Sequence, residues 1–123
     1  MSRSVLAFGA FAAVLLAAVP LEPTYYRDVI PILERHCYDC HRPGGPAMSL
    51  ANYHDAKRWA RPMRDAVLST RMPPQHPESL LRHMQETRNL TREEIQTIVR
   101  WVETGTQEGN PQDAPPRTII AHL

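Results

Sequence analysis

The residues best suited to chemistry stand together in the stretch "HCYDCHRPGG", residues 36–45. Cys37 and Cys40 are the 2 cysteines of the chain, and His41 directly follows the second of them. Two thiols at this spacing can form a disulfide, act as a redox pair, supply half of a zinc site or attach a haem covalently. The rest of the sequence is needed to choose among these four kinds of site.

Three of the four kinds of site meet an objection. A redox-active CxxC is expected at the start of a helix that follows a strand, whereas here a helical pattern precedes the motif and no convincing β pattern is found. A zinc site needs one ligand more than Cys37, Cys40 and His41, and no other histidine stands at a recognised zinc spacing. A disulfide across so small a loop is strained and easily reduced. Covalent haem accounts for all three residues, because the thiols add to the haem vinyl groups and the histidine becomes an axial iron ligand.

A second axial ligand of such an iron is usually methionine or histidine. Met72 is the first candidate, because it stands in a loop and the two prolines that follow it stiffen the backbone. His76 is the second candidate. Met63 belongs to an apolar helical stripe, where packing is the expected role, and Met48 stands too near the attachment motif to reach the opposite face of a haem.

The segments that must position these residues are helical. Hydrophobic periodicity predicts helices over Thr24–Cys37, Asn52–Thr70 and Thr91–Gly105. In the first, regular helix is expected from about Asp28, with Pro31 in its first turn. The second is expected to kink or divide at Pro62. The third begins with a capping box of Thr91 and Glu94 and ends at its glycine. The proline- and glycine-rich stretches between the helices are predicted as loops.

Four further residues are assigned supporting roles near the predicted site. Trp59 and Trp101 fall within the second and third helical segments, and both are expected in the core, with packing against the haem edge included in that role. Arg42 and Arg71 stand near the motifs in sequence and are candidates to pair with the haem propionates. The other arginines of the second helical segment are expected on a solvated face.

The start of the chain indicates export. Residues 1–18 have the layout of a secretory signal peptide, with Arg3 followed by an unbroken apolar run, and the alternative is an uncleaved N-terminal anchor. One small domain is expected over 19–116, followed by a tail at 117–123, and the polar stretch after Thr106 is expected to wrap the surface or be disordered. A periplasmic or otherwise exported location agrees with haem attachment, which is made outside the bacterial cytoplasm.

The charge balance and the motifs limit the other functions. The chain has 14 Lys and Arg against 13 Asp and Glu and lacks a basic stripe with interleaved aromatics, so nucleic-acid binding is not indicated. No nucleophile–base pair or second cofactor motif is evident, so catalysis by this chain alone is not indicated either.

The motifs taken in order resemble a family of small secreted bacterial c-type cytochrome domains, which occur alone or fused to other redox modules, including copper monooxygenase-like ones. The resemblance extends over residues 24–116 and is carried by "DVIPILERHCYDCHRPGG", "MSLANYHDAKRWARPM", "STRMPP" and "NLTREEIQTIVRWVETGTQEGNP". It implies an all-α, cytochrome c-like fold of three to five short helices around one covalently bound haem c, in which the first and last helices cross.

The resemblance also implies residue roles and a function. Cys37 and Cys40 match the thioether cysteines, His41 the proximal ligand and Met72 the distal ligand. The implied function is that of a mono-haem electron carrier for a redox protein partner, bound to no membrane beyond a possible N-terminal anchor. The alternative is a haem-based sensor or small-ligand binder, whose distal site is open or weakly held.

Two details of the resemblance concern the surroundings of the iron. A backbone carbonyl commonly orients the proximal histidine, and the carbonyls of Pro43 and Pro46 are the candidates by analogy with related cytochromes. On the distal side, Gln75 stands where the family usually has a tryptophan. A large apolar cover is therefore missing beside Met72, which is expected to lower the reduction potential and leaves His76 as a competing ligand.

Overall fold

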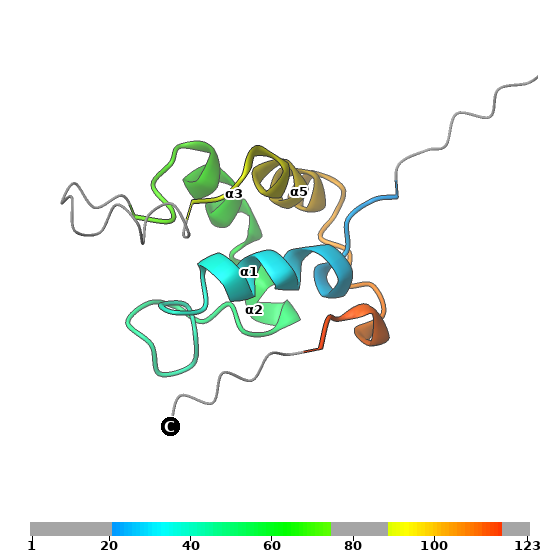
Figure 1. The fold of residues 1–123 in the computed structure, drawn as a ribbon, viewed down its shortest axis with the longest axis horizontal. Coiled ribbons are helices and arrows are strands. Elements are labelled where there is room, and N and C mark those ends of the chain that lie inside the picture. The colour runs from blue at the N-terminus through cyan, green and yellow to red at the C-terminus, as the bar shows by residue number, and fades with distance from the viewer. Residues whose placement is uncertain (1–20, 75–88, 117–123) are drawn as a thin grey trace, which may run out of the picture.

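The computed structural model describes residues 21–74 and 89–116 (Figure 1). Within these ranges the chain is helical and contains no strand, which agrees with the all-α expectation. The elements are a π-helix η1 (Tyr25–Val29), the α-helices α1 (Ile30–His36), α2 (Tyr53–Arg58), α3 (Ala60–Leu68) and α5 (Arg92–Glu103), and a 3₁₀ turn η3 (Pro111–Asp113). None of the helices in the described ranges is long and apolar enough to cross a membrane.

The first helical rod consists of η1 and α1 and is capped at its start. Thr24 and Asp28 form this cap, in which the backbone N–H of Thr24 donates to the Asp28 carboxylate at 2.8 Å. The wide turn of η1 is closed by the N–H of Ile30, which donates to the carbonyl of Tyr25. A wide turn at this point suits Pro31, because proline has no N–H and its ring clashes with the carbonyl four residues earlier. Regular α-helix thus begins two residues later than predicted, with Pro31 in its first turn as predicted.

The second helical segment is divided, as predicted, but the division lies three residues before Pro62. Asn52 caps α2 by accepting a hydrogen bond from the N–H of Asp55 at 2.9 Å, and the break falls at Trp59. Pro62 is therefore in the first turn of α3, where a missing N–H costs no intrahelical bond. The predicted core position of Trp59 is wrong, because helical spacing does not continue across a break, and the side chain is 36% exposed.

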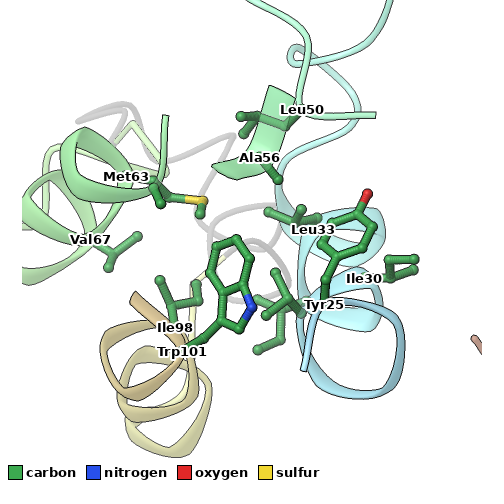
Figure 2. Close-up of a cluster of buried hydrophobic side chains, with 12 residues drawn as sticks. Tyr25, Ile30, Leu33, Leu50, Ala56, Met63, Val67, Ile98 and Trp101 are labelled. Carbon is green, nitrogen blue, oxygen red and sulfur yellow. The ribbon is translucent and has the colours of Figure 1, made fainter. Parts of the chain in front are cut away.

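The core is a single cluster centred on α5 and the first helical rod. Figure 2 shows the Trp101 indole between the α3 side chains of Met63 and Val67 and the side chains of Leu33 and Tyr25. Trp101 is 0% exposed, and its indole N–H donates to the carbonyl of residue 107 at 2.9 Å. Its predicted core position is thus confirmed. Because α5 packs both on α3 and on η1 (Figure 1), the last helix contacts the first rod.

The stretch after α5 wraps the start of the chain. Gly105 ends the helix in a left-handed conformation (φ 102°) that favours glycine, which confirms the predicted stop. The carbonyls of Gln107 and Glu108 then accept hydrogen bonds from the N–H groups of Tyr25 at 2.8 Å and Tyr26 at 3.3 Å. Up to residue 116 this stretch is therefore a surface wrap, whereas the predicted segments 1–18 and 117–123 lie outside the described residues.

The environments of the two tryptophans predict different sensitivities to substitution. Trp101→Phe removes a buried indole N–H and leaves a small cavity, so we expect the free energy of unfolding to fall by roughly 1–3 kcal/mol. The matched change Trp59→Phe, at a half-exposed side chain, should alter it by less than about 0.5 kcal/mol. Urea denaturation of the two variants and wild type measures both effects. Equal losses in the two variants would contradict the described packing.

Candidate functional site

The predicted site residues meet at one cavity of about 740 Å³. Cys37, Cys40 and His41 line it together with Met63 and Met72. The remaining wall is largely apolar and includes Pro46, Leu50, Pro62, Val67, Pro73 and Ile98. Cavities of roughly 300–1,000 Å³ with apolar walls and a few polar groups are typical of sites for small molecules and cofactors. The structure therefore brings the CxxCH motif and the predicted distal methionine to the same cavity.

The end of α1 positions the CxxCH motif. The N–H of Cys37 continues the helical pattern by donating to the carbonyl of Leu33 at 2.9 Å, and the N–H of His41 donates to the carbonyl of Cys37 at 2.9 Å. These bonds wind the motif into a turn, and Cys37, Cys40 and His41 all line one cavity. The following loop passes very close to the motif, because a Cβ atom on Gly45 would lie 2.6 Å from the carbonyl oxygen of Cys40. Only glycine fits there without a shift of the backbone.

His41 is buried and has a fixed orientation. Its Nδ1 lies 2.8 Å from the carbonyl oxygen of Met48, so Nδ1–H is the donor and Nε2 keeps its lone pair. A backbone carbonyl was expected in this role, but the prediction that Pro43 or Pro46 supplies it is wrong. The loop returns to the histidine only later, where the N–H of Leu50 donates to the carbonyl of His41 at 2.9 Å. Pro43 is exposed near the turn of the loop, and Pro46 lines the cavity instead.

Met72 reaches the cavity through the turn that ends α3. Thr70 adopts a left-handed backbone conformation (φ 57°). The N–H groups of Arg71 and Met72 then both donate to the carbonyl of Ala66, at 3.0 and 3.2 Å. The turn thus fixes the backbone of Met72 against α3, while its side chain lines the cavity and is 42% exposed. Gln75 and His76 lie outside the described residues, so their predicted effects on the distal side stay predictions.

The predicted supporting residues separate into two groups. Arg71 lines the cavity and is thus placed to pair with an acidic group in it. Arg42 is exposed and does not line the cavity, and its guanidinium Nε–H donates to the carbonyl of Asp39 at 3.2 Å. Neither Trp59 nor Trp101 lines the cavity, since the first lies at the surface and the second within the core. The expected haem contacts of Arg42 and of both tryptophans stay predictions.

Sequence reasoning missed one buried pair beside the motif. The side chain of His36 lines the cavity and is only 4% exposed, and its Nε2 lies 3.0 Å from Oε2 of Glu94. The other carboxylate oxygen of Glu94 lies 2.6 Å from Nη1 of Arg35. The capping box that was predicted from Thr91 and Glu94 is confirmed, and it fixes the carboxylate at the start of α5. Together with the expected contact of the first and last helices, the box was the signal that could have revealed the pair.

The surroundings of the pair shift the pKa of the Glu94 carboxyl and of the neighbouring Cys37 thiol. Burial by itself would raise the pKa of the Glu94 carboxyl, but the Thr91 N–H, His36 and Arg35 together hold that pKa below its usual value. Glu94 is therefore ionised at neutral pH. Burial, with smaller contributions from the charge of Glu94 and from Cys40, raises the pKa of the Cys37 thiol to about 12. Cys37 is thus a protonated thiol before any attachment reaction.

Comparisons with known proteins do not identify a family for this chain. No protein-family model matches the chain, and neither a curated protein nor a solved structure matches it. In the described part of the chain, no three or more histidine, cysteine and acidic side chains are grouped so as to hold a metal ion.

The pKa of Cys37 predicts unequal reactivity of the two thiols in the chain before haem attachment. At pH 8.5 we expect iodoacetamide to alkylate exposed Cys40 faster than Cys37, because the thiolate is the nucleophile and Cys37 is almost entirely protonated. Glu94→Gln keeps the capping box but removes the charge, so the alkylation of Cys37 should become faster. Tandem mass spectrometry of the tryptic peptide 36–57, which contains both cysteines, gives both rates.

Glu93→Gln is the matched control, because Glu93 is in the same first turn of α5 but is not among the charges that act on Cys37. If Glu94→Gln leaves the rate at Cys37 unchanged, the carboxylate does not act on this thiol.

Proposed function

We propose that the protein is a mono-haem c-type cytochrome that transfers single electrons, with His41 and Met72 as the axial ligands. The observation that carries the proposal is the cavity of about 740 Å³ that the whole CxxCH motif shares with Met72. An imidazole with a free Nε2 and a methionine sulfur are the iron donors of a haem with Met/His ligation, and the two thiols are the groups that would attach it covalently. The apolar wall suits the flat ring system of that cofactor.

Each residue has a distinct role in this proposal. Cys37 and Cys40 would form the thioethers, and Nε2 of His41 would bind the iron, with Nδ1 held by the Met48 carbonyl. Such a hydrogen bond fixes the ring and raises the basicity of the ligand. When bound, the haem iron supplies reversible one-electron chemistry between its ferric and ferrous states.

The surrounding chain controls access to the cavity. The buried side chains of Leu50, Met63, Val67 and Ile98 keep water from its inner wall. We define the cavity rim as Cys40, Met48 and Met72, three of the exposed residues that line the cavity. An electron would pass at this rim, where a partner can approach most closely. Arg71, which is exposed and lines the cavity, would pair with a haem propionate.

The proposal extends to the fold class and the biological setting. The all-α arrangement, with the attachment motif directly after the first rod and the last helix packed on that rod, supports a cytochrome c-like fold. We infer that the protein acts in the bacterial periplasm or outside the cell, and that it serves a redox protein partner without being an enzyme itself. Electron transfer needs no nucleophile or general base, so no residue of the chain takes such a role.

One observation favours a second candidate function. Met72 is 42% exposed at the cavity rim, so a small molecule could displace it from the iron. In that case the protein would be a haem-based sensor or small-ligand binder with a weakly held distal site. The occupancy of the distal position separates the two functions.

Covalent attachment is the first prediction of the proposal. Expressed in a host that matures c-type cytochromes, the wild-type chain should keep haem on a denaturing gel, as detected by peroxidase staining. The double variant Cys37→Ser/Cys40→Ser should lose it, because both thioethers are absent. Wild-type protein that carries no covalent haem from such a host would overturn the proposed function and leave the disulfide or zinc alternatives.

Ligation by Met72 is the second prediction. The oxidised protein should show the weak near-infrared band of methionine bound to ferric iron. Met72→Ala should abolish the band, lower the reduction potential and let carbon monoxide bind the reduced protein. Met48→Ala is the matched control, because Met48 is also exposed at the cavity rim, and it should keep the band. Wild-type protein without the band that binds carbon monoxide readily would establish the sensor alternative.

A further inference from the structure

A buried histidine that the proposed ligation does not use lies in the wall of the cavity. The side chain of His36 is 4% exposed and lines the same cavity as the iron ligands. Neither of its ring nitrogens has a well-directed hydrogen bond among the described residues. Its only short polar contact in that part of the chain is the 3.0 Å separation between Nε2 and the Glu94 carboxylate. The charge of the Glu94 carboxylate therefore lies directly beside this imidazole.

The charge that His36 faces is a fixed anion. Glu94 is 12% exposed at its side chain, and its carboxylate is held by the N–H of Thr91 at 2.8 Å. Arg35 also contacts it, but the side chain of Arg35 is 61% exposed, so solvent screens this contact. The field of Glu94 extends to Cys37, because the same carboxylate disfavours the thiolate there. A carboxylate beside His36 thus acts on the very sulfur to which the haem would be attached.

Building on the proposed haem function, we propose that His36 binds a proton more tightly when the haem iron is reduced, so that this protein couples electron transfer to proton binding. In the step, one electron passes from the redox partner to the iron, which goes from ferric to ferrous. In the pH range where the ring changes its charge, a fraction of a proton per electron passes from solvent to the ring of His36. The added negative charge in the cavity is thereby balanced in part by the positive imidazolium, which pairs with Glu94.

The sign of the effect follows from these charges. With His36 neutral, the Glu94 carboxylate is left without a buried cation, and its negative charge disfavours an added electron. With His36 protonated, the pair is neutral as a whole, and reduction is easier. Histidine is the side chain that changes charge between about pH 5 and 8, so the reduction potential should fall as the pH rises through that range.

Other charged groups around the cavity are poorer candidates. The titratable lining residues besides His36 are Cys37, Cys40, His41, Asp39, Asp65 and Arg71. The proposed function uses the first three as haem anchors and ligand. Asp39, Asp65 and Arg71 are exposed, so solvent screens their charges. Among the described residues, the pair of His36 and Glu94 is thus the buried ionisable group that remains beside the cavity.

The experiment is a redox titration of the intact haem protein from pH 5 to 8 by spectroelectrochemistry. For wild type, we expect the equilibrium constant for reduction by a fixed donor to fall roughly three- to tenfold over this range. His36→Gln should remove most of this dependence. Glu94→Gln should raise the constant at pH 8 by a similar factor, because the buried negative charge is gone. His54→Gln, at an exposed histidine of α2 that does not line the cavity, and Glu93→Gln should behave as wild type.

A second measurement keeps the inference testable if a variant fails to fold. In wild-type protein, the Hε1 resonance of His36, followed by NMR as the pH is changed, should titrate at higher pH in the ferrous than in the ferric form. A potential that does not change with pH, or a pH dependence that persists in His36→Gln, would overturn the inference. Those outcomes leave the proposed function intact, whereas protein without covalent haem would overturn that function first.

Discussion

The hydrogen bond between Nδ1 of His41 and the Met48 carbonyl is the constraint on which the candidate site depends. It fixes which nitrogen of the ring can bind a metal, and it closes the loop that follows the CxxCH motif. The loop can close so tightly because Gly45 allows its backbone to pass over the carbonyl of Cys40. The motif, the loop and the histidine therefore form one local unit, held by contacts among residues that are near one another in sequence.

The wall of the cavity that carries Met72 is positioned by the two ends of the short helix α3. The break before α3 and the left-handed turn at Thr70 together deliver Met72 to the cavity. Proline recurs around this cavity, at Pro46, Pro62, Pro73 and Pro74. Because proline carries no backbone N–H, a wall built from it presents no donor that would need a partner in an apolar space. Some of the many prolines of the sequence thus do more than shape loops, because they line the cavity without adding an unpaired N–H donor.

Local patterns in the sequence were sufficient to predict the helices and the CxxCH motif. The burial of individual side chains depends on tertiary contacts, which local patterns do not show. The capping box of Thr91 and Glu94 and the CxxCH motif each involve neighbours a few residues apart, so both could be predicted. The surface position of Trp59 could not, since it depends on where the second helix breaks. The buried state of His36 depends on the contact between the end of α1 and the start of α5, which are separated by residues 37–93. The capping box alone does not predict that contact, and the expected crossing of the first and last helices is needed as well.

The backbone pairing of residues 107 and 108 with Tyr25 and Tyr26 ties both ends of the described domain to one pole of the molecule. The first helical rod runs from that pole to the CxxCH motif, a distance of roughly 15–18 Å at the rise of a helix. A tether or a neighbouring module that is joined ahead of Thr24 would therefore be attached at the pole opposite the CxxCH motif. The cavity would then lie at the end of the first rod away from the attachment point, where it would stay accessible to a diffusing partner.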